Sequence, residues 1–185
     1  DTFEPWDLLI DARRRFESDL PVERPQTEPD IALHLPGKYL ILIEAKFTSS
    51  NTFYENGPRA NGQSLTLDEL LSIYHDPKLR ILNYDRAMNA DKVAYQLWRN
   101  TVFAEWMARA DHRKTQAYHV NLVRSGYEQD SAAGFASLVN QGFQDRFRRL
   151  TWEQIHRRTN GEPRLRTLKK YFENKTAALK PAFRI

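Results

Sequence analysis

The chain has 185 residues, 41% of them hydrophobic and 12% aromatic, which is long and apolar enough for one domain with a full core. The absence of cysteine excludes a disulfide framework, a thiol nucleophile and cysteine-based zinc sites. No apolar run reaches the ~18–20 residues that cross a bilayer, and no signal-peptide core is present, so we expect an intracellular, cytoplasmic protein without a membrane partner.

Residues 5–20 are predicted to form the first helix. Pro5 suits a first turn, and apolar side chains recur at helical spacing. Glu17 lies at the edge of the apolar stripe, where it either reaches a neighbouring site or faces solvent. The stripe consists of Leu9, Ala12, Phe16 and Leu20.

A β-hairpin is predicted next, over residues 30–47. Two arms rich in β-branched and aliphatic residues flank a Pro36-Gly37-Lys38 turn. Pairing Leu35 with Tyr39 places Asp30 opposite Glu44, and Lys46 shares their face. The other face is wholly apolar and is expected to belong to the core; it holds Ile31, Leu33, Leu35, Ile41, Ile43, Ala45 and Phe47.

The acidic end of this hairpin has the outline of a metal and phosphate site. Two carboxylates that face each other on a sheet repel, and a divalent cation would offset the repulsion. Mg²⁺ binds through one or two carboxylates and leaves its other positions to water and phosphate oxygens. Lys46 would orient a water or stabilise charge on phosphate, which predicts metal-assisted phosphodiester hydrolysis. The alternative is a structural salt bridge from Lys46 to Asp30 or Glu44.

The sequence Pro29-Asp30, fourteen residues ahead of Glu44-Ala45-Lys46, resembles the PD-(D/E)xK motif of the restriction-endonuclease-like nuclease superfamily. The resemblance implies that Asp30 and Glu44 bind Mg²⁺ or Mn²⁺ and that Lys46 is catalytic. Some members place a further acid on the preceding helix, which makes Glu17 a candidate metal ligand. Glu28, two residues before Asp30 on the same strand face, is an equal candidate.

Residues 48–64 are predicted to form a polar loop directly after the catalytic strand. Long loops in compact domains are usually functional or disordered. Arg59 is therefore a candidate phosphate contact, and an insertion without a role is the alternative.

Residues 90–108 contain no glycine or proline and are predicted to form a long helix. Gln96 and Asn100 fall inside its main apolar stripe, so each either bonds to backbone or reaches the acidic end of the hairpin. Some branches of the superfamily have a helix glutamine followed four residues later by tyrosine. Position 100 is asparagine here, so the resemblance assigns only Gln96 to the site. A second apolar face predicts burial nearly all round: Tyr95, Trp98, Val102 and Trp106.

The rest of the chain completes an α/β pattern. Residues 117–124 are predicted to be a strand, and residues 131–141 a short helix. The order helix, strand, strand, loop, helix, strand, helix predicts a central mixed β-sheet flanked by helices. This agrees with a single restriction-endonuclease-like domain over residues 1–185.

The net charge of +4 is unevenly divided. Residues 146–185, expected to be a helical part, hold twelve Lys and Arg against three Asp and Glu, whereas residues 1–145 have a balance of −5. A basic surface is typical of phosphate-backbone binding, and a solvated helix face is the alternative. The basic side chains expected to bind nucleic acid are Arg146, Arg148, Arg149, Arg157, Arg158, Lys169 and Lys170.

Together with these patterns, the resemblance implies a Mg²⁺-dependent DNA endonuclease that acts in restriction, in defence against mobile elements or in repair, with RNA as an alternative substrate. The competing hypothesis is a catalytically inactive nucleic-acid-binding or protein-interaction module with the same fold. A Ser-His-Asp hydrolase is a further class, although none of the five histidines lies in a nucleophile-elbow pattern. A homodimer or a larger complex remains open.

Overall fold

The computed structural model describes residues 29–46, 51, 53–55, 66–111, 114–125, 129–170 and 173. Several predicted features lie outside these described residues. They are the helix over residues 5–20 with Glu17, the candidate ligand Glu28, and Arg59 of the predicted loop.

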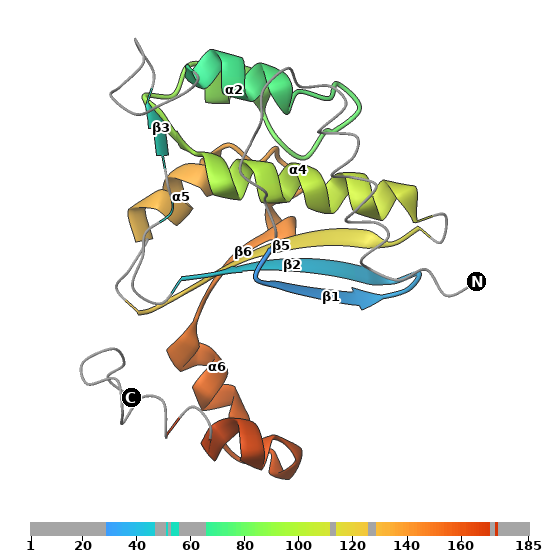
Figure 1. The fold of residues 1–185 in the computed structure, drawn as a ribbon, viewed down its shortest axis with the longest axis vertical. Helices are drawn as coiled ribbons and strands as arrows, with labels where there is room; N and C mark the ends of the chain where they lie inside the picture. The colour runs from blue at the N-terminus through green and yellow to red at the C-terminus, as the bar shows by residue number, and fades with distance from the viewer. Residues whose placement is uncertain are drawn as a thin grey trace.

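A four-stranded mixed sheet, ordered β1-β2-β5-β6, forms the centre of the described part (Figure 1). β1 (Ile31–Leu35) runs antiparallel to β2 (Tyr39–Ala45). β2, β5 (Gln116–Val123) and β6 (Phe147–Thr151) are parallel to one another. Their carboxyl ends therefore meet at one edge, which is where α/β sheets bind their ligands. The predicted α/β class with a mixed, helix-flanked sheet is confirmed.

The predicted hairpin and its register are confirmed. Leu35 pairs with Tyr39, and the amide of Lys38 donates to the carbonyl of Leu35 at 2.9 Å to close the turn. Gly37 adopts a φ of 71°, a backbone conformation that glycine reaches without a steric penalty.

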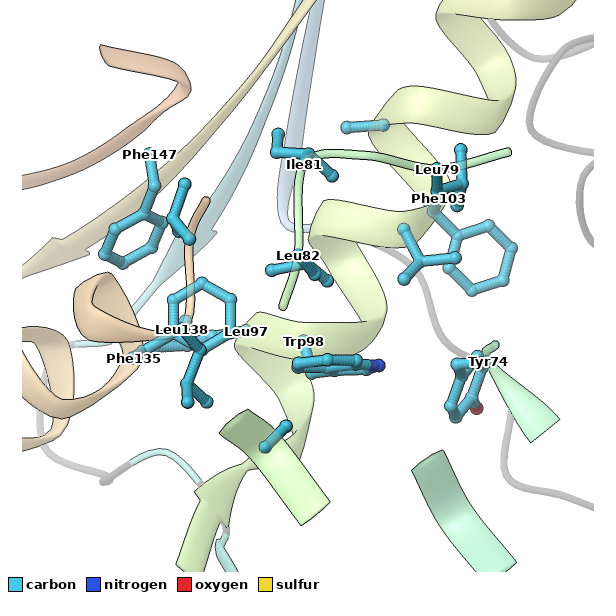
Figure 2. Packing of buried hydrophobic residues seen from close by; sticks show 14 of the residues in the cluster. Tyr74, Leu79, Ile81, Leu82, Leu97, Trp98, Phe103, Phe135, Leu138 and Phe147 are labelled. Carbon is cyan, nitrogen blue, oxygen red and sulfur yellow. The ribbon is translucent and has the colours of Figure 1, made fainter. Parts of the chain in front are cut away.

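α4 (Tyr95–Ala110) crosses one face of the sheet (Figure 1). It packs on Leu40 and Leu42, which are both completely buried. Its opposite side lies beneath α2 (Leu67–Ile73), so the prediction of burial nearly all round is confirmed. Figure 2 shows Leu97 and Trp98 of this helix among other buried side chains, including Leu82, Phe135 and Leu138.

The hairpin face that was expected to form the core is the less buried one, so this prediction was wrong. Alternation along a strand determines which residues share a face, but α4 determines which face is covered. It covers the face of Leu40, Leu42 and Glu44. On the other face Ile31 is 38% exposed, and Leu33 and Leu35 are each 51% exposed. Ile41, Ile43 and Ala45 of that face pack against a smaller cluster formed by Val120, Leu122 and Trp152, which Ile155 of α6 also contacts. Phe47 lies outside the described residues.

Two predicted segments differ in structure. Residues 53–55, within the predicted loop, form β3 (Phe53–Glu55). β3 pairs antiparallel with β4 (Lys92–Ala94), which replaces the first residues of the predicted helix 90–108. Strands of three residues are too short to show a periodic pattern.

Two short helices that the sequence analysis did not predict precede α4. Thr66 begins α2 with a capping box: its hydroxyl accepts from the Glu69 amide at 3.2 Å, and the Glu69 carboxylate accepts from the Thr66 amide at 2.7 Å. α3 (Tyr84–Met88) follows. The short helix predicted at 131–141 is confirmed as α5 (Gln129–Ser137), with shifted ends.

The basic C-terminal stretch is not wholly helical. After a short 3₁₀ turn (Gln144–Arg146), it supplies β6 of the sheet and then α6 (Trp152–Thr159) and a second turn (Pro163–Leu165). α6 lies on the face of the sheet opposite α4 (Figure 1). Within the described ranges, no helix combines the length and apolarity that a bilayer crossing requires.

Candidate active site

Glu44 is the centre of the site. It lies near the carboxyl end of β2, on the face that α4 covers, and is 5% exposed. One carboxylate oxygen, Oε1, lies 2.6 Å from Nζ of Lys46, because residues two apart on a strand share a face. The other, Oε2, accepts a 2.8 Å hydrogen bond from Nδ2 of Asn100. Both contacts are charge-assisted and fix the orientation of the carboxylate.

Asp30 lies in a bend before β1 and is exposed. The hairpin register, continued by one residue, places it opposite Glu44. Its Oδ2 accepts a 2.6 Å hydrogen bond from the amide of Ala45, so the carboxylate is held at the backbone position next to Glu44. Its Oδ1 makes no hydrogen bond with the part of the chain that the structure describes.

Asn100 is the residue of the candidate site that the sequence-based assignment left out. Helical periodicity placed both Gln96 and Asn100 in the sheet-facing stripe of α4, but the resemblance selected only Gln96. In the structure Asn100 is 1% exposed and contacts Glu44, and half-buried Gln96 lies one turn earlier on the same side of α4. Helical periodicity showed that both residues face the sheet, but it could not distinguish between them.

A row of polar side chains continues from Glu44 across the sheet. Asn121 of β5 pairs with Glu44, and Arg149 of β6 pairs with Asn121, so all three share one face. Asn121 is completely buried, and its Oδ1 accepts from Asn51 at 3.4 Å. With strands about 4.8 Å apart, the backbone of Arg149 lies roughly 10 Å from that of Glu44. The row therefore places a positive side chain near the acidic end of the sheet.

The predicted nucleic-acid-binding residues do not lie on a single surface. Arg148 and Arg149 alternate along β6 and so project to opposite faces of the sheet. Arg146 lies 5.1 Å from the centre of the Tyr118 ring and donates to the carbonyl of Ala117 at 3.1 Å. Arg157 and Arg158 are exposed on α6, Lys170 is exposed, and Lys169 pairs with Glu173 at 3.7 Å.

His119 is buried beneath α4 on the same face of the sheet. Its Nδ1 lies 2.8 Å from the hydroxyl of Thr101, which also donates to the carbonyl of Leu97. Burial lowers the pKa of His119 to about 3, because the charged ring would lose its hydration. The imidazole is therefore neutral at physiological pH and joins β5 to α4.

Another cluster brings a histidine, an acid and a hydroxyl together but has the wrong order for nucleophilic catalysis. Nε2 of His34 lies 3.2 Å from Oδ2 of Asp111, and the hydroxyl of Thr115 donates to the same oxygen. A catalytic triad needs the histidine between the acid and the hydroxyl, whereas here the acid lies between the other two. The cluster instead joins β1 to the segment before β5.

The donor set at the hairpin fits a hard divalent cation. Asp30 and Glu44 offer carboxylate oxygens, the ligands that Mg²⁺ prefers, and two carboxylates are as many as such sites commonly use. Among the described residues, no group of three or more acidic, histidine or cysteine side chains could hold a metal ion. Two protein ligands would thus leave room for water and phosphate oxygens. The candidate third ligands, Glu17 and Glu28, lie outside the described residues.

Comparison with known proteins places the chain in a family. The model of a protein family, described as restriction endonuclease associating with ARP, matches residues 13–175. This range includes the hairpin, α4 and every strand of the central sheet. No curated protein and no solved structure matches the chain significantly.

Proposed function

The chain belongs to the restriction-endonuclease family described as associating with ARP, and on this premise we propose that it is a Mg²⁺-dependent DNA endonuclease. Membership confirms the resemblance to the restriction-endonuclease-like superfamily and suggests DNA as the substrate. One observation carries the proposal further: buried Glu44 and partly buried Lys46 form an ion pair at the carboxyl edge of the parallel strands, with Asp30 bonded to the adjacent amide.

Each side chain of the candidate site has its own role in the proposed reaction. Asp30 and Glu44 hold the cation, which when bound supplies Lewis-acid polarisation of the scissile phosphate. Lys46 presents its ammonium beside Glu44, where it stabilises negative charge on phosphate oxygens as water attacks. Asn100 keeps Glu44 in one orientation, and Gln96, one turn earlier, is assigned to contact substrate or water in the same space.

Energetics supports a functional reading of the buried pair. Taking two charges out of water costs several kcal/mol, and well-packed apolar residues often replace such pairs with no loss of stability. Stability alone therefore does not explain why two charges lie at this position. A site that must hold a cation and a phosphate does need charges of both signs.

One observation favours the alternative of an inactive binding module. Both oxygens of Glu44 already have partners, Lys46 and Asn100, as expected for a structural salt bridge. A bound cation would have to displace the ammonium of Lys46 or share an oxygen with it. Metal dependence therefore separates the two candidate functions.

Contacts to nucleic acid are proposed for the basic residues of β6, α6 and the segment that follows. Arg149 is the best placed, because it shares the polar row of Glu44. Arg59 keeps its assignment as a phosphate contact. The family description also names association with ARP. We propose that this chain binds such a partner, either as a monomer or as a homodimer. A role in restriction, defence or repair follows from the proposed activity.

The test is cleavage of supercoiled plasmid by the purified chain in Mg²⁺ or Mn²⁺, compared with EDTA. We expect nicking or linearisation that requires the cation and falls by at least about a hundredfold in Lys46→Ala, as loss of transition-state charge stabilisation does elsewhere. Lys38→Ala, in the exposed hairpin turn, is the matched control and should cleave normally.

Structured RNA is tested in parallel, because the same chemistry cuts either backbone. Cleavage of RNA alone would correct the substrate. Folded protein that binds DNA in a salt-sensitive manner without cutting any substrate in either metal would establish the binding module instead.

A further inference from the structure

Arg99 of α4 is a buried arginine without an anionic partner. The residue is 8% exposed, and its guanidinium forms no hydrogen bond or ion pair with any residue that the structure describes. An arginine stays charged at physiological pH, and a buried charge that lacks both a counter-ion and an acceptor is costly. The described part of the chain therefore keeps a positive charge at this position without neutralising it.

The guanidinium lies over the ring of Tyr95, the first residue of α4, with Cζ 5.2 Å from the ring centroid. A ring face attracts a cation, but it does not supply acceptors for the five N–H donors of an arginine. Nε is buried and has no acceptor, whereas the two terminal nitrogens are not fully buried. An anion can therefore reach the end of the guanidinium.

The first turn of α4 provides a second feature that favours an anion. The first amides of a helix have no acceptor within it, and they form the positive end of its dipole. α4 has 16 residues, its N-cap Ala94 makes no side-chain hydrogen bond, and its first turn contains no acid. Because the guanidinium lies over the first residue of the helix, the amides and Arg99 can act on the same anion.

This first turn lies at the same edge of the sheet as the acidic site. Asn100 contacts Glu44 near the carboxyl end of β2, whereas Asp111, directly after α4, contacts His34 beside the amino end of β2. α4 thus runs antiparallel to β2, and its first residue lies about 7.5 Å along the helix axis before Asn100. Figure 1 shows α4 beginning on the side where β2 ends.

We propose that Arg99 and the first turn of α4 bind a backbone phosphate of the DNA, other than the phosphate that is cut. The fork of an arginine matches two oxygens of a phosphate, and the helix amides add donors from a second direction. This inference rests on the proposed function, because it takes the substrate of the acidic site as the source of the phosphate. Arg99 is a binding residue here, and the chemistry stays with Asp30, Glu44 and Lys46.

The test is a fluorescence-anisotropy titration of a short DNA duplex with the purified chain in EDTA, where the proposed cleavage does not occur. Arg99→Met removes the charge and keeps an unbranched side chain. We expect its Kd to be about tenfold higher than that of the wild type, as for the loss of a charged hydrogen bond. The slope of log Kd against log salt concentration should fall by about one. Arg80→Met, in the exposed loop before α3, is the matched control and should bind like the wild type.

The melting temperature separates a binding role from a structural one. An apolar side chain often replaces buried charges without loss of stability, so Arg99→Met should melt no lower than the wild type. Arg99→Lys keeps the charge but lacks the planar fork, so it should retain the salt slope and have an intermediate Kd.

Three results would overturn the proposal: no DNA binding by the wild type, equal affinity in Arg99→Met, or a clearly lower melting temperature in Arg99→Met. Calorimetry with inorganic phosphate tests for a free anion. Phosphate binding that requires Arg99, in a chain whose DNA affinity does not, would also overturn it.

The titration in EDTA keeps this inference separate from the nuclease proposal. A chain that binds DNA through Arg99 but never cuts it would refute the proposed cleavage and leave the phosphate contact in place. A chain that cuts DNA but binds it independently of Arg99 would refute the phosphate contact alone.

Discussion

Glu44 is held by groups from two different elements. Lys46 directly follows the strand of Glu44, Asn100 comes from α4, and the carboxylate they share is almost completely buried. A buried charge that loses one partner keeps its full desolvation penalty. We therefore propose Asn100 as a positioning residue, which would act on the proposed reaction only through Glu44.

Replacing Asn100 with alanine should affect both stability and cleavage. We expect the free energy of unfolding to fall by about 1–3 kcal/mol, because Glu44 Oε2 would lose its donor. The cleavage rate should fall by about 10–100-fold, as it does when the partner of a metal ligand is removed. Urea denaturation and plasmid cleavage measure the two effects.

Asn89→Ala, at the exposed end of α3, is the matched control for this variant. It should leave cleavage unchanged. Full activity in Asn100→Ala would show that the orientation of Glu44 does not matter for the reaction.

Some of the contacts of Glu44 could be predicted from the sequence, and others could not. The spacing of Asp30, Glu44 and Lys46 and the hairpin register were sufficient to place these three residues together. The sequence could not tell whether Gln96 or Asn100 contacts Glu44. Periodicity shows which side of a helix faces the sheet, but not where the helix lies along its own axis relative to the sheet. That position is decided by packing of α4 on Leu40 and Leu42.

At the scale of elements, we expect the contact between His119 of β5 and Thr101 of α4 to make stability depend on pH. His119 is neutral in the folded chain, where burial lowers its pKa to about 3, but titrates near its ordinary pKa of 6.5 when the chain unfolds. The unfolded state therefore binds an extra proton as pH falls below 6.5. This contribution to stability is complete above pH 6.5 and is lost progressively towards pH 3.

We expect the free energy of unfolding to decrease by up to about 1.4 kcal/mol per pH unit in that window through His119. Denaturation at pH 7 and pH 5 should show this loss in the wild type and a smaller loss in His119→Leu. Thr101→Val, which removes the hydroxyl but keeps the histidine, should retain the pH dependence. Equal losses in wild type and His119→Leu would refute the assignment.

Element prediction succeeded where patterns were long. The hairpin, β5 and α5 were found, and α4 was found with its start misplaced by β4. β6 was missed because the Arg148 and Arg149 pair made its stretch resemble the rest of a basic, helical tail. The covered face of the hairpin was misassigned, because the apolar content of a face does not determine which face a helix covers.

At the scale of the whole molecule, the acidic site shares one face of the sheet with Arg149, one of the basic residues. The parallel strands β2, β5 and β6 bring their carboxyl ends to one edge, with Glu44 and Arg149 two strands apart on one face. Arg149 of the basic segment, whose charge balance is +9, thus lies on the same face as Glu44 of the segment whose balance is −5. One sheet therefore carries both the proposed cation site and a basic side chain proposed to bind phosphate.

The most direct test of this account is the change in melting temperature that Mn²⁺ produces relative to EDTA, in wild type, Glu44→Gln and Asp30→Asn. A cation that binds only the folded chain adds about 2.7 kcal/mol of stability at one hundred times its Kd. We predict a clear rise in the wild-type melting temperature and little or none in either variant. An equal rise in all three proteins, or no rise in a wild type that still cleaves DNA, would contradict a metal site at Asp30 and Glu44.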